Sequence, residues 1–178
     1  MLSDSLLKFL PEEVTHFRTK AYRGARVEKL KELVYSGDLD YEFERSRGLL
    51  VLIGTNNLKF DTPGEIVFKI LTFVQLIKTK FRHLEIHIST LLPRIDKAVL
   101  NAKIPVINDL LKERAKKFNF SIADLGSTFY KKKNLKEPWH WKDDGLHLSD
   151  VGLRKVKESI NNYIYRASLK KDECKLCF

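Results

Sequence analysis

The chain has 178 residues, of which 43% are hydrophobic and 31% are charged, and its formal net charge is +10. This composition is typical of one globular domain and excludes an intrinsically disordered chain. No apolar run approaches the roughly 18 residues of a membrane helix, and the first residues lack the regions of a signal peptide, so we expect an intracellular, cytoplasmic protein.

The first half of the chain alternates apolar runs with helical patterns, which is typical of α/β proteins. We expect a short helix over residues 6–10 and a strand over residues 14–19. Apolar residues at helical spacing predict a helix over residues 25–35. The continuous apolar run over residues 49–53 ends at Gly54 and predicts a central parallel strand that is buried on both faces.

The second half of the chain continues this alternation. Thr62-Pro63-Gly64-Glu65 has the pattern of a capping box with proline at the first helical position, and predicts the start of a helix. A strand nearer the edge of the sheet is expected over residues 84–89, a helix over residues 104–118 and a short strand over residues 120–123. The residues expected to face the sheet from the capped helix are Val67, Ile70, Leu71, Val74 and Ile77.

The last part of the chain closes the predicted domain. Residues 127–148 show no clear periodicity, and Ser149 predicts the cap of a final helix. The order of elements predicts a three-layer α/β/α sandwich with a mainly parallel sheet of about five strands. One domain is expected over residues 1–170, followed by a basic tail over residues 171–178.

Two cysteines, Cys174 and Cys177, lie in this tail. A Cys-x-x-Cys pair is found as half of a zinc site or as a redox pair, and equally as two thiols on a tail. The chain holds no second half of such a zinc site, because it ends at Phe178. We therefore predict no metal site, and the zinc alternative implies a module that continues beyond this chain.

Polar or glycine-bearing segments follow the predicted strands or precede the last helix. In parallel sheets, loops at the carboxyl ends of the strands hold the functional site. The segments are Ser3-Asp4-Ser5-Leu6, Gly24, Gly54-Thr55-Asn56-Asn57 and Asp144-Gly145-Leu146-His147. Their side chains and N–H groups form a complete set for acyl transfer.

Ser5, His147 and Asp144 are the predicted catalytic triad. Serine becomes a good nucleophile when a histidine takes its proton, and a carboxylate fixes the tautomer of that histidine. Asp144 precedes His147 by three residues and can reach its ring in a tight turn, while the adjacent Asp143 is the alternative. Alone, Ser5 would be a helix N-terminal residue and His147 a half-buried histidine, but the complete set favours catalysis.

The backbone N–H groups of Ser5 and Gly24 and the side-chain amide of Asn56 are the predicted oxyanion hole. Glycine suits this role because its backbone can approach a substrate closely. The alternatives are that Asn56 is a turn residue and that Gly24 only begins a helix. This chemistry requires no cofactor.

The order and spacing of these blocks resemble the SGNH hydrolase superfamily, also called the GDSL esterases, whose four blocks supply Ser, Gly, Asn and His. The matching residues are Ser5, Gly24, Asn56 and His147, with Asp144 three residues before the histidine. The resemblance covers nearly the whole chain and implies a flavodoxin-like α/β/α fold. It implies a serine esterase that acts on small acyl esters of the acetyl type, carried by a small molecule or a lipid.

The chain departs from the family pattern at two motifs. The usual Gly-Asp-Ser is Ser3-Asp4-Ser5 here, and the usual Gly-x-Asn-Asp ends in Asn57, so a carboxylate is lost. Only Met1-Leu2 precede the first motif, which predicts either a very short first strand or a chain that starts late.

Within the superfamily, the sequence looks most like the esterase domains of LINE-type retrotransposons, encoded in their first open reading frame. The similarity lies in Gly24-Ala25-Arg26-Val27-Glu28 and in Leu91-Leu92-Pro93-Arg94 followed by Asn101 and Asn108. A more distant similarity is to the SGNH-like domain of Oskar, which binds RNA without the usual triad.

The positive charge supports an alternative function. It is compatible with an anionic partner such as RNA, DNA or an acidic protein, and equally with a merely basic domain. Lys131, Lys132 and Lys133 are candidate phosphate contacts or simply lysines of a solvated loop. The alternative to an active esterase is a catalytically silent module of the same fold that binds RNA or DNA. A lipid-surface role ranks last, because no amphipathic insertion helix is evident.

Overall fold

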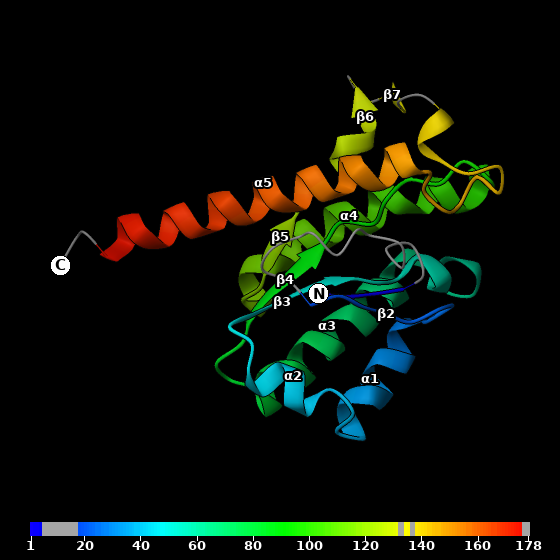
Figure 1. Ribbon diagram of the computed structural model, residues 1–178. Helices are drawn as coiled ribbons and strands as arrows, with labels where there is room; N and C mark the ends of the chain where they lie inside the picture. Colours follow the sequence, from blue (N-terminus) through cyan, green and yellow to red (C-terminus); the bar gives the residue numbers. More distant parts are fainter. Residues whose placement is uncertain (5–17, 132–133, 136–137, 176–178) are drawn as a thin grey trace.

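A sheet of five parallel strands runs through the centre of the molecule (Figure 1). The structure is a computed structural model that describes residues 1–4, 18–131, 134–135 and 138–175. The spatial order of the strands is β2-β1-β3-β4-β5. Their bounds are β1 (Leu2–Ser3), β2 (Lys20–Ala21), β3 (Gly48–Leu52), β4 (Glu85–Ser89) and β5 (Ser121–Ala123).

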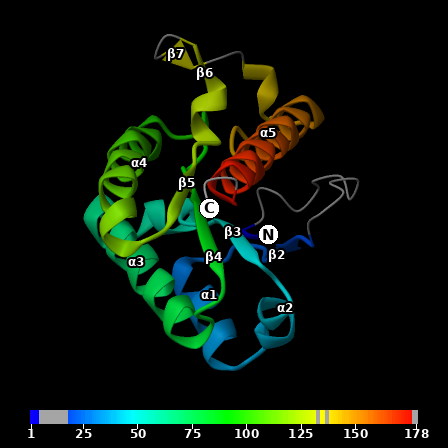
Figure 2. The same ribbon diagram turned by 90° about the vertical axis from the view of Figure 1, so that its left-hand side faces the viewer.

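Helices cover both faces of this sheet, with α1, α3 and α4 on one face and α5 on the other (Figure 2). The α-helices are α1 (Val27–Tyr35), α2 (Asp40–Glu44), α3 (Pro63–Lys80), α4 (Ala98–Phe118) and α5 (Asp150–Lys175). Short elements complete the fold: the 3₁₀ helices η2 (Thr55–Lys59), η3 (Gly126–Phe129) and η4 (Pro138–His140), and a small hairpin of β6 (Tyr130–Lys131) and β7 (Asn134–Leu135). The predicted three-layer α/β/α sandwich is therefore confirmed. Within the described residues, no helix is both long and apolar enough to cross a membrane.

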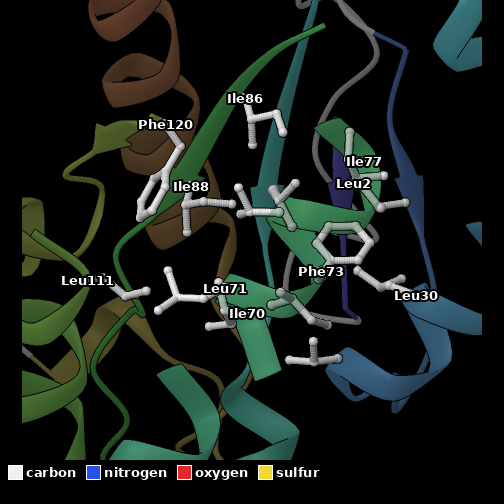
Figure 3. Packing of buried hydrophobic residues seen from close by; sticks show 14 of the residues in the cluster. Leu2, Leu30, Ile70, Leu71, Phe73, Ile77, Ile86, Ile88, Leu111 and Phe120 are labelled. Atoms are coloured by element: carbon white, nitrogen blue, oxygen red, sulfur yellow. The ribbon is translucent and has the colours of Figure 1, made fainter. Parts of the chain in front are cut away.

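The central strand β3 explains why its sequence is apolar without interruption. Leu49 and Val51 pack into the core under α1, α3 and α4, whereas Leu50 and Leu52 pack into the core under α5. Successive side chains of a strand point to opposite faces, and here both faces are covered. Figure 3 shows part of the first of these cores, in which Phe73 of α3 and Leu30 of α1 pack in one cluster with Leu2 of β1.

The capping box of α3 forms as predicted. The Thr62 hydroxyl accepts a hydrogen bond from the Glu65 N–H (3.3 Å), and the Glu65 carboxylate accepts one from the Thr62 N–H (2.7 Å). Pro63 occupies the first turn, where its missing N–H costs no helical bond. All five apolar residues expected to face the sheet from this helix are buried.

Several predicted elements differ from the structure. Of the predicted strand over residues 14–19 the structure describes only residues 18–19, which are not a strand, and β2 follows them at Lys20–Ala21. Residues 14–17 and the predicted helix over residues 6–10 lie outside the described residues, so these predictions are not tested. Helix α4 begins at Ala98, earlier than the predicted residue 104, because burial of Leu100 outweighs the preference against helix before Pro105. Helix α2 was not predicted, since five residues are too few to show a helical period.

The strand order places β1 at the point where the winding of the sheet reverses. The chain passes from β1 to β2 on one side, and then to β3, β4 and β5 on the other. In a sheet of this kind, the crevice at the carboxyl ends of the strands around this point is where ligands bind. The segments after β1, β2 and β3 therefore lie where a ligand is expected to bind.

Candidate active site

The predicted nucleophile Ser5 lies outside the described residues, but the residues before it are well held at the carboxyl end of β1. The Asp4 N–H donates to the Leu52 carbonyl (3.3 Å), and the Tyr22 N–H donates to the Ser3 carbonyl (2.9 Å). Ser3, which stands where the family pattern has glycine, is fully buried, and its hydroxyl donates to the Asp4 carbonyl (3.0 Å). The chain thus reaches Asp4 between β2 and β3, at the reversal point of the sheet.

Gly24 lies in a turn between β2 and α1. The turn is closed by the Ala25 N–H, which donates to the Tyr22 carbonyl (3.1 Å). Gly24 has a φ of 67°, and a side chain added there would meet no atom within 4 Å. Its backbone conformation, rather than lack of space, therefore requires glycine.

Asn56 lies directly after β3 and beside this turn. Its side-chain amide donates to the Ala25 carbonyl (2.9 Å), one residue after Gly24. An amide nitrogen carries two hydrogens, and this bond uses one of them. The structure thus brings the two predicted oxyanion residues next to each other, while their role stays a prediction.

Asn57 joins the loops after β2 and β3, a role that the sequence did not reveal. Its carbonyl oxygen accepts from the Val27 N–H (3.0 Å) at the start of α1. Its amide nitrogen donates to the carboxylates of Glu28 (3.1 Å) and Asp61 (2.6 Å). The side chain is fully buried. Asparagine fits here because an aspartate would add a third carboxylate and could not donate.

Lys69 balances the two carboxylates around Asn57. Its ammonium lies 2.5 Å from a Glu28 oxygen and 2.7 Å from an Asp61 oxygen. Burial alone would raise the pKa of both acids, but hydrogen bonds from Lys69 and Asn57 outweigh it and lower both pKa values. Glu28 and Asp61 are therefore ionised at neutral pH.

Asp144 and His147 contact each other in the turn before α5. The Asp144 carboxylate accepts a hydrogen bond from Nδ1 of the His147 ring (2.5 Å) and from the N–H groups of Leu146 (2.9 Å) and His147 (2.8 Å). Burial would raise the pKa of Asp144, but these three bonds outweigh it and lower the pKa to about 2. Asp144, rather than the adjacent Asp143, is thus the carboxylate on the ring, and the ring side chain is 36% exposed.

The turn that contains Asp144 and His147 is hydrogen-bonded to the loop after β4. Gly145 has a φ of 63°, and its carbonyl accepts from the N–H groups of Ile95 (2.8 Å) and Asp96 (3.2 Å). A side chain at Gly145 would lie 2.8 Å from the Asp96 nitrogen, so the two backbones are in direct contact. The signal for this contact in the sequence was the glycine inside Asp-Gly-Leu-His.

The aromatic residues before this turn fasten it to the body of the domain. The Trp141 ring is buried, lies 5.4 Å from the Phe129 ring, and donates through its N–H to the Pro93 carbonyl (3.1 Å). His140 is buried too, with its ring 5.7 Å from that of Phe129. These contacts hold the loop before the Asp144–His147 turn against the body of the domain. The side chain of Trp139 is outside the described part of the chain.

The remaining candidate residues are not placed. Lys132, Lys133 and Cys177 lie outside the described residues, and the side chains of Lys131 and Cys174 are likewise outside the description. Among the side chains that the structure does describe, no three His, Cys, Asp or Glu residues are grouped to hold a metal ion. The nucleic-acid contacts and the zinc alternative stay predictions.

Comparison with known proteins agrees with this architecture. The model of the GDSL-like Lipase/Acylhydrolase family matches residues 2–155. A GDSL-like lipase from Bacteroides thetaiotaomicron has a similar fold, with a TM-score of 0.76 and 12% identity over 93% of this chain and 86% of that one. No curated protein sequence matches the chain.

Two further solved structures are similar. An acetylxylan esterase from Geobacillus stearothermophilus gives a TM-score of 0.64 and 16% identity over 80% of this chain and 70% of that one. The esterase domain of the ZfL2-1 ORF1 protein, from a zebrafish retrotransposon, gives 0.51 and 17% over 92% and 96%. At such identities these likenesses show the fold alone, and by TM-score the folds of the two bacterial structures are more similar to this chain than that of the retrotransposon domain.

Proposed function

The chain belongs to the GDSL-like lipase/acylhydrolase family and is a serine hydrolase of the esterase type, and we propose that it hydrolyses small acyl esters. In the proposed mechanism, Ser5 is the nucleophile, His147 is the base and Asp144 is the carboxylate that orients the base. The observation that carries this proposal is the 2.5 Å contact between Asp144 and Nδ1 of His147. A carboxylate on Nδ1 fixes the tautomer of the ring in which Nε2 carries no proton, so that Nε2 can take a proton from the nucleophile.

The proposed reaction has two halves. His147 takes the hydroxyl proton of Ser5, which attacks the ester carbonyl and forms a tetrahedral intermediate. The oxyanion is stabilised by the amide of Asn56 and the N–H groups of Gly24 and Ser5. His147 then protonates the leaving alcohol, and an acyl-enzyme remains. Water, deprotonated by the same histidine, hydrolyses this acyl-enzyme and releases the acid.

The test is hydrolysis of short-chain chromogenic esters by the wild-type protein and by Ser5→Ala. Activity should vanish in Ser5→Ala and persist in Ser168→Ala, a matched control at an exposed serine of α5. Loss of Asn56 by Asn56→Ala should lower kcat roughly 10²–10³-fold, the typical effect of removing one oxyanion donor. Wild-type turnover in folded Ser5→Ala would overturn the proposal.

The proposal also specifies the size of the acyl group. We infer an acetyl-type ester, as the resemblance implies, and a series of acetate, butyrate and octanoate esters of one alcohol tests it. The acetate should give the highest kcat/KM. A steady increase of kcat/KM with chain length would replace the small acyl group by a lipid-like one.

We also propose that this chain is the esterase domain of a LINE-type retrotransposon protein. This proposal is supported by the motifs around Gly24 and Arg94 and by a shared fold with one retrotransposon esterase domain. Binding of RNA or DNA, the alternative to catalysis, is supported by the net charge of +10. Both functions can coexist on one chain, because basic surfaces and an acyl-transfer site need different residues.

A further inference from the structure

We propose that Arg94 and Asp96 are positioning residues for the proposed catalytic histidine. By pairing with each other they shape the loop after β4 into a clamp of two N–H groups that holds the carbonyl of Gly145, and with it the Asp144–His147 turn. This inference rests on the proposed function, because it is in that function that His147 acts as the base.

The pair is bidentate and partly buried, with Arg94 buried and Asp96 more exposed. Nε of Arg94 donates to one oxygen of the Asp96 carboxylate (2.6 Å), and Nη2 donates to the other (2.5 Å). The Arg94 side chain is only 7% exposed and that of Asp96 17%. The hydrogen bonds from Arg94 hold the pKa of Asp96 below its ordinary value, so the carboxylate is charged at neutral pH. Two parallel charge-assisted bonds fix the geometry as well as the energy of such a pair.

The pairing closes a tight loop of three residues. Arg94 and Asp96 flank Ile95, and the Arg94 N–H is held by the side chain of Asn101 at 3.0 Å. Within this loop, the N–H groups of Ile95 and Asp96 converge on one acceptor, the Gly145 carbonyl. Consecutive N–H groups converge in this way only in a turn conformation, and the side-chain pair is what spans that turn.

The Gly145 carbonyl connects the clamp to the histidine. Gly145 is the residue after Asp144, whose carboxylate caps the turn and binds the His147 ring. The turn is closed by the Lys142 N–H, which donates to the His147 carbonyl (2.8 Å), and by the Gly145 N–H, which donates to the Lys142 carbonyl (2.9 Å). The turn is therefore a small rigid unit, and moving its attachment point moves the ring. A misplacement of about 1 Å in such a group can cost on the order of 10²-fold in rate.

The experiment compares Arg94→Met, Arg94→Lys and Lys80→Met, all assayed well below their melting temperatures. Arg94→Met should lower kcat for a short-chain ester about 10²-fold and change KM by less than about twofold, because substrate contacts are untouched. Arg94→Lys should not restore kcat, since an ammonium cannot make the two parallel bonds. Lys80→Met removes a different ion pair, with Asp40 at 2.8 Å, at the C-terminal end of α3, and should leave kcat unchanged.

A second measurement does not depend on turnover. The ¹⁵N shifts of the His147 ring report the hydrogen bond of Nδ1, and they should change in Arg94→Met, including when Ser5→Ala is present. Unchanged shifts with a normal kcat would overturn the positioning role, as would full rescue by Arg94→Lys. If the wild type hydrolyses no ester but the ring shifts still move, the proposed function fails and the positioning role stands.

Discussion

At the scale of single residues, Asn57 shows how one buried side chain can connect the segments that follow two strands, β2 and β3. It bonds the first N–H of α1 and two carboxylates, one from the first turn of α1 and one from the loop after η2, and it has no exposed surface. The chemistry of its neighbours requires an amide: one end must accept and the other must donate twice. The family pattern has a carboxylate at this position, whereas in this chain Glu28 and Asp61 supply the carboxylates and Asn57 supplies the amide that donates to them.

Replacing Asn57 by aspartate tests this account. Asn57→Asp buries a charge beside two carboxylates and removes two donated bonds, which should lower the free energy of unfolding by about 2–4 kcal/mol. Urea denaturation measures the loss. Asn162→Asp, at an exposed position of α5, is the matched control and should change stability by less than about 0.5 kcal/mol. Equal stabilities for the two variants would contradict the role of Asn57.

The choice between Asp143 and Asp144 can be settled by activity. Asp144→Asn should lower kcat by roughly 10³–10⁴-fold, because an amide can stabilise the wrong tautomer of the histidine. Asp143→Asn should retain nearly all activity, since the structure pairs the ring with Asp144. Steady-state hydrolysis of one chromogenic ester by both variants is sufficient, and the opposite ranking would move the triad to Asp143.

The pKa of Asp144 has a consequence for pH dependence. The folded pKa is about 2, below the ordinary value near 3.9, so its bonds are fully present above pH 4 and are lost as the pH falls through about 2. Acid inactivation above pH 4 is therefore not expected to come from Asp144. A ¹³C NMR titration of its carboxyl group should show a midpoint near pH 2, rising in His147→Gln, in which the bond from Nδ1 is lost. Because this side chain is 48% exposed, the effect on stability should stay below about 1 kcal/mol.

At the scale of elements, α5 can begin close to η4 because Gly152, in its first turn, has no side chain. The His140 carbonyl accepts from the Ser149 N–H (2.9 Å), and a methyl group at Gly152 would overlap that carbonyl oxygen. Gly152→Ala should therefore destabilise the protein by about 1–3 kcal/mol and lower esterase activity, because α5 begins just after His147. Gly64→Ala in α3 has open space and should be neutral or stabilising by up to about 1 kcal/mol. Thermal unfolding of both variants measures the difference between their stabilities. Equal stabilities would mean that η4 can shift to make room for the methyl group and would contradict this account.

Elements with strong local signals were predictable, and those fixed by long-range contacts were not. The run over residues 49–53, the capping box at Thr62 and the cap at Ser149 all identified real elements, because each signal is local. Strand β2 was missed because Lys20–Ala21 has no apolar pattern and exists only through pairing with β1. In the same way, sequence order suggested the partners Asp144 and His147, but not the clamp on Gly145 or the bonds of Asn57.

At the scale of the whole molecule, the net charge of +10 predicts weak binding to nucleic acids regardless of sequence. We expect a Kd for single-stranded RNA of about 10⁻⁴–10⁻⁶ M near physiological salt, with log K falling linearly against log salt. Fluorescence anisotropy with two RNAs of unrelated sequence measures both the slope and the specificity. No binding at low salt would remove the nucleic-acid alternative.

The position of β1 in the sheet has a consequence for how activity is gained during folding. This strand comes first in the chain but lies between β2 and β3, and the proposed nucleophile follows it directly. The histidine proposed as its base comes after all five strands of the sheet. Closing so long a loop is slow compared with forming helices. In refolding from denaturant, circular dichroism should therefore recover first, and the ability to cleave an ester should appear only in the last kinetic phase.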